Sequence, residues 1–170
     1  MFDGMDPFWK KLLWEQLGAG IDTMENAIRA CPEKVWGDRS RRPEYWYLVY
    51  HALFFLDLYL SDSVEGFAPP PPFTLSEMDP SGVMPDRVYT QAELLKYLEH
   101  SREKARDRIR SLTDEKARQH CKYGSVDGTV ADLLLYNLRH LQHHAAQLNL
   151  ILRQTIDSAP HWVFRARQPL

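Results

Sequence analysis

The chain has 170 residues, of which 44% are hydrophobic and 26% are charged, and its formal net charge at pH 7 is -2. This length suits one globular domain, and we expect residues 1–170 to form it, with a core at about 7–155 and a tail at 156–170. The small net charge gives no electrostatic reason to expect nucleic acid as a partner. No apolar run approaches the roughly 20 residues that span a bilayer, so no membrane association is expected.

The two cysteines, Cys31 and Cys121, form no disulfide framework and show no C-x-x-C spacing. The N-terminal segment MFDGMDPFWKKLLWEQ lacks the order of basic, apolar and small residues that marks a signal peptide. We therefore expect a cytoplasmic protein with free thiols.

Two helices are predicted in the first part of the chain. The first runs from about Pro7 to Ala30, where Asp6 can cap the first turn and proline suits a first helical position. The second, at about 44–60, has the sequence EYWYLVYHALFFLDLYL and is apolar nearly all round, so it should lie deep in the fold. A segment without periodicity follows at 63–89, and its proline run favours an extended conformation. Connections this long are uncommon in small domains, and both a cover over one end of the bundle and a flexible linker fit it.

Two more helices are predicted after this Pro-rich loop. The third begins at Thr90, which with Glu93 forms a capping-box pattern, and the fourth runs over about 129–155. No segment indicates a β-sheet, and the tail is expected to pack on the bundle through Trp162 and Phe164. The predicted fold is an all-α four-helix bundle with a long crossover loop between helices two and three, which lets these two helices lie parallel.

The fourth helix carries histidines on its apolar face. At 100° per residue, His140 and His144 point toward the core, whereas His143 lies about 60° from His140 toward the polar side. A buried imidazole needs partners for both ring nitrogens, and two neighbouring imidazoles discourage each other's protonation. Both should therefore be neutral, which is the form that binds a metal ion.

A third ligand is available on the second helix, where His51 interrupts an apolar stripe. Three histidines with open coordination positions are typical of catalytic rather than structural metal sites. The H-x-x-x-H spacing of His140 and His144 lacks the glutamate of H-E-x-x-H, so a zinc protease would have no general base. The alternative, in which the histidines are hydrogen-bonded core residues, stays open at this point.

The segments LVYHALFFLDLYL and LRHLQHHAAQLNLIL resemble the DinB-like superfamily, which includes the damage-inducible DinB family and related thiol-dependent transferases. The resemblance places the family's helix-two histidine at His51 and its H-x-x-x-H-x-x-Q pattern at His140, His144 and Gln147. It implies an up-up-down-down four-helix bundle that holds a divalent metal, often zinc or nickel, on three histidines, and frequently forms homodimers. Known activities in the superfamily include metal-assisted attack of a low-molecular-weight thiol on an electrophile. The chain departs from the family pattern at Ala146, where glycine is common, and in its longer Pro-rich loop.

The function expected from these features is that of a metal-dependent enzyme of the thiol S-transferase or hydrolase type. Zinc or nickel is favoured, iron also suits the ligands, and a low-molecular-weight thiol is a candidate cosubstrate. Asn137, Gln147 and His143 lie close enough to the ligand pair to orient ligands or substrate, although Asn137 and Gln147 fit a helix-contact role equally well. The alternative function is a non-catalytic stress-response or binding module, in which exposed Leu135 and Leu150 would suit a homodimer or partner contact.

Overall fold

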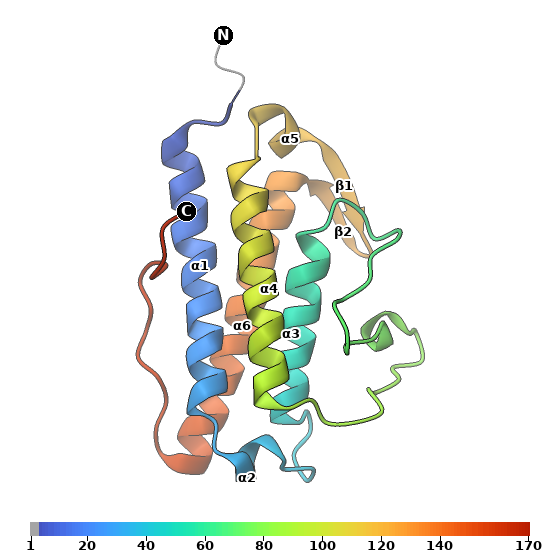
Figure 1. Ribbon diagram of the computed structural model, residues 1–170, viewed down its shortest axis with the longest axis vertical. Coiled ribbons are helices and arrows are strands. Elements are labelled where there is room, and N and C mark those ends of the chain that lie inside the picture. Colours follow the sequence, from blue (N-terminus) through green and yellow to red (C-terminus); the bar gives the residue numbers. More distant parts are fainter. Residues whose placement is uncertain (1–3) are drawn as a thin grey trace.

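Four long helices form the body of the computed structural model, which describes residues 4–170 (Figure 1). They are α1 (Pro7–Ala30), α3 (Tyr45–Tyr59), α4 (Gln91–Arg110) and α6 (Val130–Ile156), which confirms the predicted all-α class. The first three residues of the segment considered as a signal peptide lie outside the described part. Among the described residues, no helix is both long enough and apolar enough to cross a membrane.

The direction of the helices differs from the predicted order. α3 and α4 run parallel to each other and antiparallel to α1 and α6, so the order along the chain is up-down-down-up (Figure 1). Gln91 at the start of α4 donates to the Cys31 carbonyl at the end of α1 over 2.6 Å, which fixes these two ends together. The short connection after α1 forces α3 to turn back, whereas only the long segment before Gln91 can return the chain to the starting end of α3. The up-up-down-down order that the family resemblance implied is therefore wrong, whereas α3 and α4 lie parallel (Figure 1), as the long loop between them predicted.

Side-chain caps fix where the helices begin. Asp6 accepts a hydrogen bond from the Phe8 amide at 2.8 Å at the start of α1. The predicted capping box of α4 is present, since Thr90 and Glu93 each satisfy the other's backbone amide. A second capping box, between Thr129 and Asp132, starts α6. Each such cap stabilises its helix by about 1 kcal/mol, because it satisfies amides that have no partner in the first turn.

Short elements complete the fold, namely α2 (Glu33–Trp36), the 3₁₀ helix η1 (Ser76–Met78), α5 (Asp114–Arg118), and the strands β1 (His120–Tyr123) and β2 (Val126–Thr129). The strands form an antiparallel hairpin in which Tyr123 faces Val126 across the turn. Gly124 takes the positive φ of 61° that the turn requires. The prediction of no sheet was wrong because strands of four residues are too short to show an alternating pattern.

The Pro-rich loop packs along the side of the bundle rather than hanging free. The ring of Phe73 stacks on Tyr97 of α4 at a centroid distance of 4.4 Å and meets Tyr89 edge-on at 4.8 Å. Tyr50 of α3 donates a hydrogen bond of 2.7 Å to the Thr74 carbonyl. These contacts hold η1 beside α3, so that Glu77 of η1 reaches His51.

The C-terminal tail lies along α1 (Figure 1), but not by the residues predicted. Trp162 and Phe164 are 76% and 68% exposed, so they do not anchor it. The tail is held instead by a backbone hydrogen bond of 2.9 Å from the Ala166 amide to the Glu15 carbonyl, and by hydrogen bonds to side chains, among them one of 2.8 Å from Trp14 Nε1 to the Gln168 carbonyl. Gly18 permits this approach, because a Cβ atom there would lie only 2.5 Å from that of Ala166.

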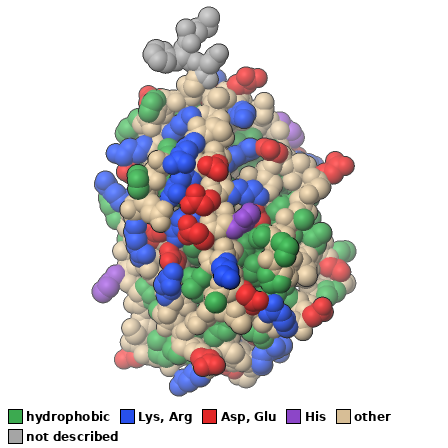
Figure 2. All heavy atoms as spheres, viewed as in Figure 1, with side chains coloured by type: hydrophobic (Ala, Val, Ile, Leu, Met, Phe, Trp, Pro, Cys, Tyr) green, Lys and Arg blue, Asp and Glu red, His purple; other side chains and the backbone are tan. Residues whose placement is uncertain are grey.

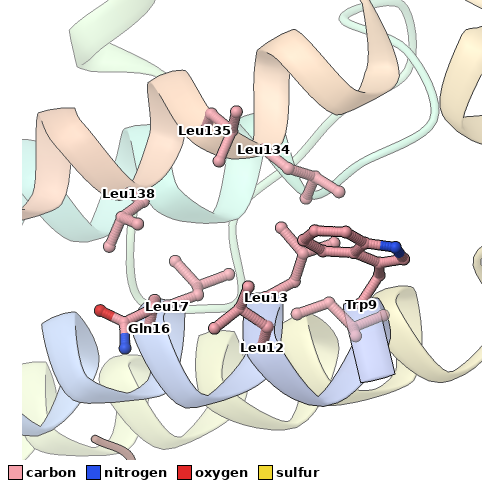
Figure 3. A pocket seen from close by; sticks show the side chains of 9 residues that line it. Trp9, Leu12, Leu13, Gln16, Leu17, Leu134, Leu135 and Leu138 are labelled. Carbon is pink, nitrogen blue, oxygen red and sulfur yellow. The ribbon is translucent and has the colours of Figure 1, made fainter. Parts of the chain in front are cut away.

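Two features of the surface bear on partners. Figure 2 shows basic and acidic side chains interspersed over the face drawn there, without an extended region of one sign. An apolar groove of about 320 Å³ lies between α1 and α6 (Figure 3). Trp9 and Leu12 of α1 and Leu135 of α6 are among its lining residues.

Candidate metal centre

The antiparallel packing of α3 on α6 brings the three predicted ligands together. One ring nitrogen from each of His51, His140 and His144 lies within 4.8 Å of the others. The ring of His144 is centred 4.6 Å from that of His140 and 4.8 Å from that of His51. The one-turn spacing on α6 thus supplies two ligands, and the facing position on α3 supplies the third.

Gln147 fixes the orientation of His144. Its Oε1 atom lies 2.8 Å from His144 Nδ1, and an amide oxygen can only accept a hydrogen bond. His144 Nδ1 therefore carries the proton, and the lone pair of the neutral ring is on Nε2. The Nε2 atom faces the other histidines, so this arrangement presents a ligand atom to the cluster.

Glu77 fixes His51 in the same way. Its Oε2 atom lies 2.6 Å from His51 Nδ1, and the Glu77 side chain is only 3% exposed. Glu77 belongs to η1, so the Pro-rich loop reaches the site through this residue. A carboxylate that accepts a hydrogen bond from Nδ1–H leaves the lone pair of the neutral imidazole on Nε2, as is common in metal-binding histidines.

His140 completes the cluster. Its Nε2 atom is 3.2 Å from His144 Nε2, whereas two nitrogens bound to one tetrahedral ion at 2.0–2.1 Å lie about 3.3 Å apart. The donor set and this spacing therefore fit a divalent ion, and the cluster could hold one. The same spacing also permits a direct hydrogen bond between the two rings. His140 Nδ1 is buried without a hydrogen-bond partner among residues 4–170.

The protonation state of the pair favours metal binding. Burial, followed by the proximity of His144 and His51, lowers the pKa of His140 to about 4. Burial and the proximity of His51 lower the pKa of His144 to about 4 as well. Both rings are therefore neutral near pH 7, so that a metal ion need displace no proton from them.

The comparison with protein families agrees with this geometry. The sequence model of the DinB superfamily matches residues 16–148, a span that includes the three histidines and Gln147. The chain belongs to the DinB superfamily. None of the curated proteins and none of the solved structures compared with the chain matches it.

Aromatic rings surround the histidine cluster of this DinB superfamily chain. Phe55 is centred 4.8 Å from His51 and 5.6 Å from His140, and Tyr136 stacks on His140 at 6.2 Å. Tyr59 meets the same histidine edge-on at 6.1 Å. These rings exclude water from one side of the cluster, which strengthens electrostatic interactions at the imidazoles.

The remaining predicted residues have other positions. Asn137 is fully buried and donates a hydrogen bond of 3.1 Å to the Leu56 carbonyl, so it joins α6 to α3 and supports the helix-contact interpretation. His143 is exposed on the other side of α6, where it lines a hollow together with Trp162 and Phe164. It is not part of the three-histidine cluster.

Glu77 is the residue that sequence reasoning missed. It lies in a loop without periodicity, and nothing in the spacing of TLSEM relates it to a histidine on another element. The available signal was general, since metal-binding histidines commonly pair with a carboxylate, but this rule does not say which carboxylate.

Proposed function

We propose that the protein binds one divalent metal ion through Nε2 of His51, His140 and His144 and uses the open coordination positions for catalysis. The observation that carries this proposal is the fixed tautomer of His51 and His144, whose Nδ1 atoms are held by Glu77 and Gln147. In these tautomers the Nε2 lone pairs of His51 and His144 point toward one place. A metal ion requires this arrangement, whereas histidines that serve only as hydrogen-bonded core residues do not. Imidazole donors suit zinc, nickel and iron, and the superfamily resemblance favours zinc or nickel.

The proposed reaction class follows from the chemistry of a divalent ion held by three histidines. A bound divalent ion lowers the pKa of a coordinated water or thiol and polarises an electrophile, which serves both hydrolysis and thiol transfer. Glu77 Oε2 accepts a hydrogen bond from His51 Nδ1–H and so makes Nε2 of that imidazole a stronger metal ligand. Gln147 holds His144 in place, while Phe55 and Tyr59 keep water from one side of the cluster. Thiol transfer is the activity we favour on the family resemblance.

In thiol transfer, the nucleophile would come from a second small molecule rather than from the chain. Cys31 is buried at the end of α1, and burial raises its pKa to about 12, so it is a poor nucleophile at neutral pH. Burial also raises the pKa of Cys121, which lies in β1. A low-molecular-weight thiol is therefore the proposed cosubstrate, and water takes its place in the hydrolase alternative.

The test of this proposal is the metal content of untagged protein purified without a nickel column. The wild type should carry about one ion per chain, His144→Ala should carry almost none, and the exposed neighbour variant His143→Ala should match the wild type. Loaded and metal-free protein are then compared against a panel of electrophiles with several thiols and with water. Equal rates with and without the ion would overturn the catalytic part, and a wild type that takes up no zinc, nickel or iron would overturn the metal site.

A non-catalytic binding or stress-response module is the second candidate function, and the α1–α6 groove is the observation that favours it. Trp9 projects there with 55% of its surface exposed, next to the apolar hollow that includes Leu12 and Leu135 (Figure 3). A projecting aromatic ring and a hollow on one surface are self-complementary, as a two-fold symmetric interface requires. We propose that a second copy of the chain covers this groove. In a purely structural role, loss of metal would unfold the protein or dissociate this dimer, with no reaction to lose.

A further inference from the structure

We propose that His140 is the exchangeable ligand of the metal centre, and that its proton moves from Nε2 to Nδ1 when an ion binds. The three histidines of the cluster differ in their hydrogen-bond partners. The Nδ1 atoms of His51 and His144 each have an acceptor. The Nδ1 atom of His140 is buried and has none among residues 4–170. The inference rests on the proposed function, because it distinguishes among the ligands that this function requires.

The hydrogen bond between the two histidines of α6 determines where the proton of His140 lies. Because Gln147 holds the proton of His144 on Nδ1, the Nε2 atom of His144 has a lone pair and can only accept. His140 Nε2 lies 3.2 Å from this atom, so it is the donor. A neutral imidazole carries one ring proton, which leaves the lone pair of His140 on Nδ1.

This tautomer of His140 cannot bind an ion at the cluster. Its Nε2 atom faces His144 and must give up the proton to become a ligand. His51 and His144 already present their Nε2 lone pairs and need no such change. The hydrogen bond between His140 and His144 is therefore exchanged for the ion. The ring of His140 stays neutral, since its proton moves to Nδ1 and is not released.

The proton that moves to Nδ1 of His140 meets no protein acceptor among residues 4–170. Around this histidine lie the rings of Phe55, Tyr59 and Tyr136, centred 5.6, 6.1 and 6.2 Å from its own ring. Aromatic rings accept an N–H only weakly, and a buried donor without an acceptor destabilises the state that contains it. Loss of the partner of a metal-binding histidine typically weakens metal binding about 10–100-fold. His140 should therefore be the weakest of the three ligands.

A ligand that leaves readily widens what the centre can bind. Three histidines leave one open position on a four-coordinate ion, whereas a molecule with two donor atoms needs two. Release of His140 would provide the second position and remove the unpaired Nδ1 proton, while His51 and His144 keep the ion. We therefore expect a bidentate ligand to displace His140 and neither of the other two.

The tautomers can be read from ¹H–¹⁵N spectra of protein labelled with ¹⁵N at histidine, which show which ring nitrogen carries the proton. In protein freed of metal by a chelator, we expect the proton on Nδ1 in His51 and His144 and on Nε2 in His140. Zinc should move the proton in His140 alone. A proton already on His140 Nδ1 before zinc is added would overturn this inference alone. If zinc changes none of the three rings, the proposed function fails together with it.

Alanine variants give an independent measure of the strength of each ligand. His140→Ala should bind zinc about tenfold more tightly than His144→Ala, which removes a ligand one turn away on the same helix. Competition with a chromophoric chelator measures both affinities. His143→Ala is the control for loss of a histidine from this helix, since His143 is exposed and outside the cluster. Equal affinity of the two ligand variants, or weaker binding by His140→Ala, would overturn the ranking.

Acetohydroxamate tests the exchange itself, because it binds zinc through two oxygen atoms. Added to the zinc-loaded, ¹⁵N-labelled protein, it should move the ring resonances of His140 to those of an imidazole without metal. The resonances of His51 and His144 should keep their metal-bound positions. Retention of all three histidines on the ion, or release of His51 or His144, would overturn the assignment of His140 as the exchangeable ligand.

Discussion

The Oε2 atom of Glu77 lies 2.6 Å from Nδ1 of His51, and this contact ties the Pro-rich loop to the three-histidine cluster. The loop is a long connection that joins two parallel helices, and it also delivers the carboxylate that orients one of the three imidazoles. A loop that completes a site is constrained at that point even where the rest of its sequence is irregular.

Replacing Glu77 should weaken metal binding. Glu77→Gln keeps an acceptor oxygen but removes the negative charge that makes His51 a strong metal ligand. We therefore expect the metal affinity to fall by about 10–100-fold. Competition with a chromophoric chelator measures this affinity. Glu65→Gln, at an exposed position of the same loop, is the control and should bind metal like the wild type. Unchanged affinity in Glu77→Gln would mean that the carboxylate does not support the site.

Glu93, which pairs with Arg87 and caps α4, predicts a pH dependence of stability. The hydrogen bond from Arg87, followed by that from the Thr90 amide, lowers the pKa of Glu93 from 4.5 to about 2. Because the pKa is lower in the folded than in the unfolded chain, the ionised carboxylate stabilises the fold above pH 4.5, and this contribution is lost as the pH falls toward 2. Glu93→Gln should destabilise the protein by about 1 kcal/mol at pH 7, and its difference from the wild type should shrink over that pH range.

Urea unfolding at a series of pH values measures this difference. Glu103→Gln, on the exposed face of the same helix, controls for the loss of a surface charge. A difference between wild type and Glu93→Gln that stays constant from pH 7 to pH 2 would contradict the assignment of this contribution to the ionised Glu93 carboxylate.

The close approach of the tail to α1 at Gly18 predicts that a larger residue there would detach the tail. Gly18→Ala should favour the isolated helix by about 1 kcal/mol, yet its methyl group would lie 2.5 Å from the Ala166 Cβ atom. We therefore expect the tail to detach, with loss of hydrogen-exchange protection at the Ala166 amide, which bonds to the Glu15 carbonyl. Adding Ala166→Gly in the same chain should restore protection. If the double variant remains as unprotected as the single one, the steric explanation is wrong.

The candidate site was predictable from the sequence only where the residues follow a periodic pattern. His140 and His144 could be placed because a helical repeat puts them on one apolar face, and His51 because it interrupts an apolar stripe. Gln147 was named through the family pattern, and its Oε1 atom lies 2.8 Å from His144 Nδ1. Glu77 could not be found, because its position depends on the packing of Phe73 against α4 rather than on any repeat.

In the fold, too, the features that follow a periodic pattern were predictable and the others were not. Helix positions follow from apolar spacing and caps, so α1, α3, α4 and α6 were predicted to within a few residues. Helix direction depends on how the connections pack in space, and the tail is held by single hydrogen bonds to Glu15, Trp14 and Asp22 of α1, which follow no periodic pattern. Trp162 and Phe164 were expected to be buried because they are large and apolar, yet a small residue, Ala166, fits against Gly18 where they would not.

The proposed dimer can be tested with two leucines of α6. Leu135 and Leu150 are 52% and 55% exposed, but only Leu135 lines the α1–α6 groove. Leu135→Glu should weaken self-association at least tenfold, because a carboxylate would be buried against the apolar surface of the second copy. Leu150→Glu should leave the dimer intact. Sedimentation velocity over a range of protein concentrations measures both, and dissociation by Leu150→Glu alone would place the interface elsewhere on α6.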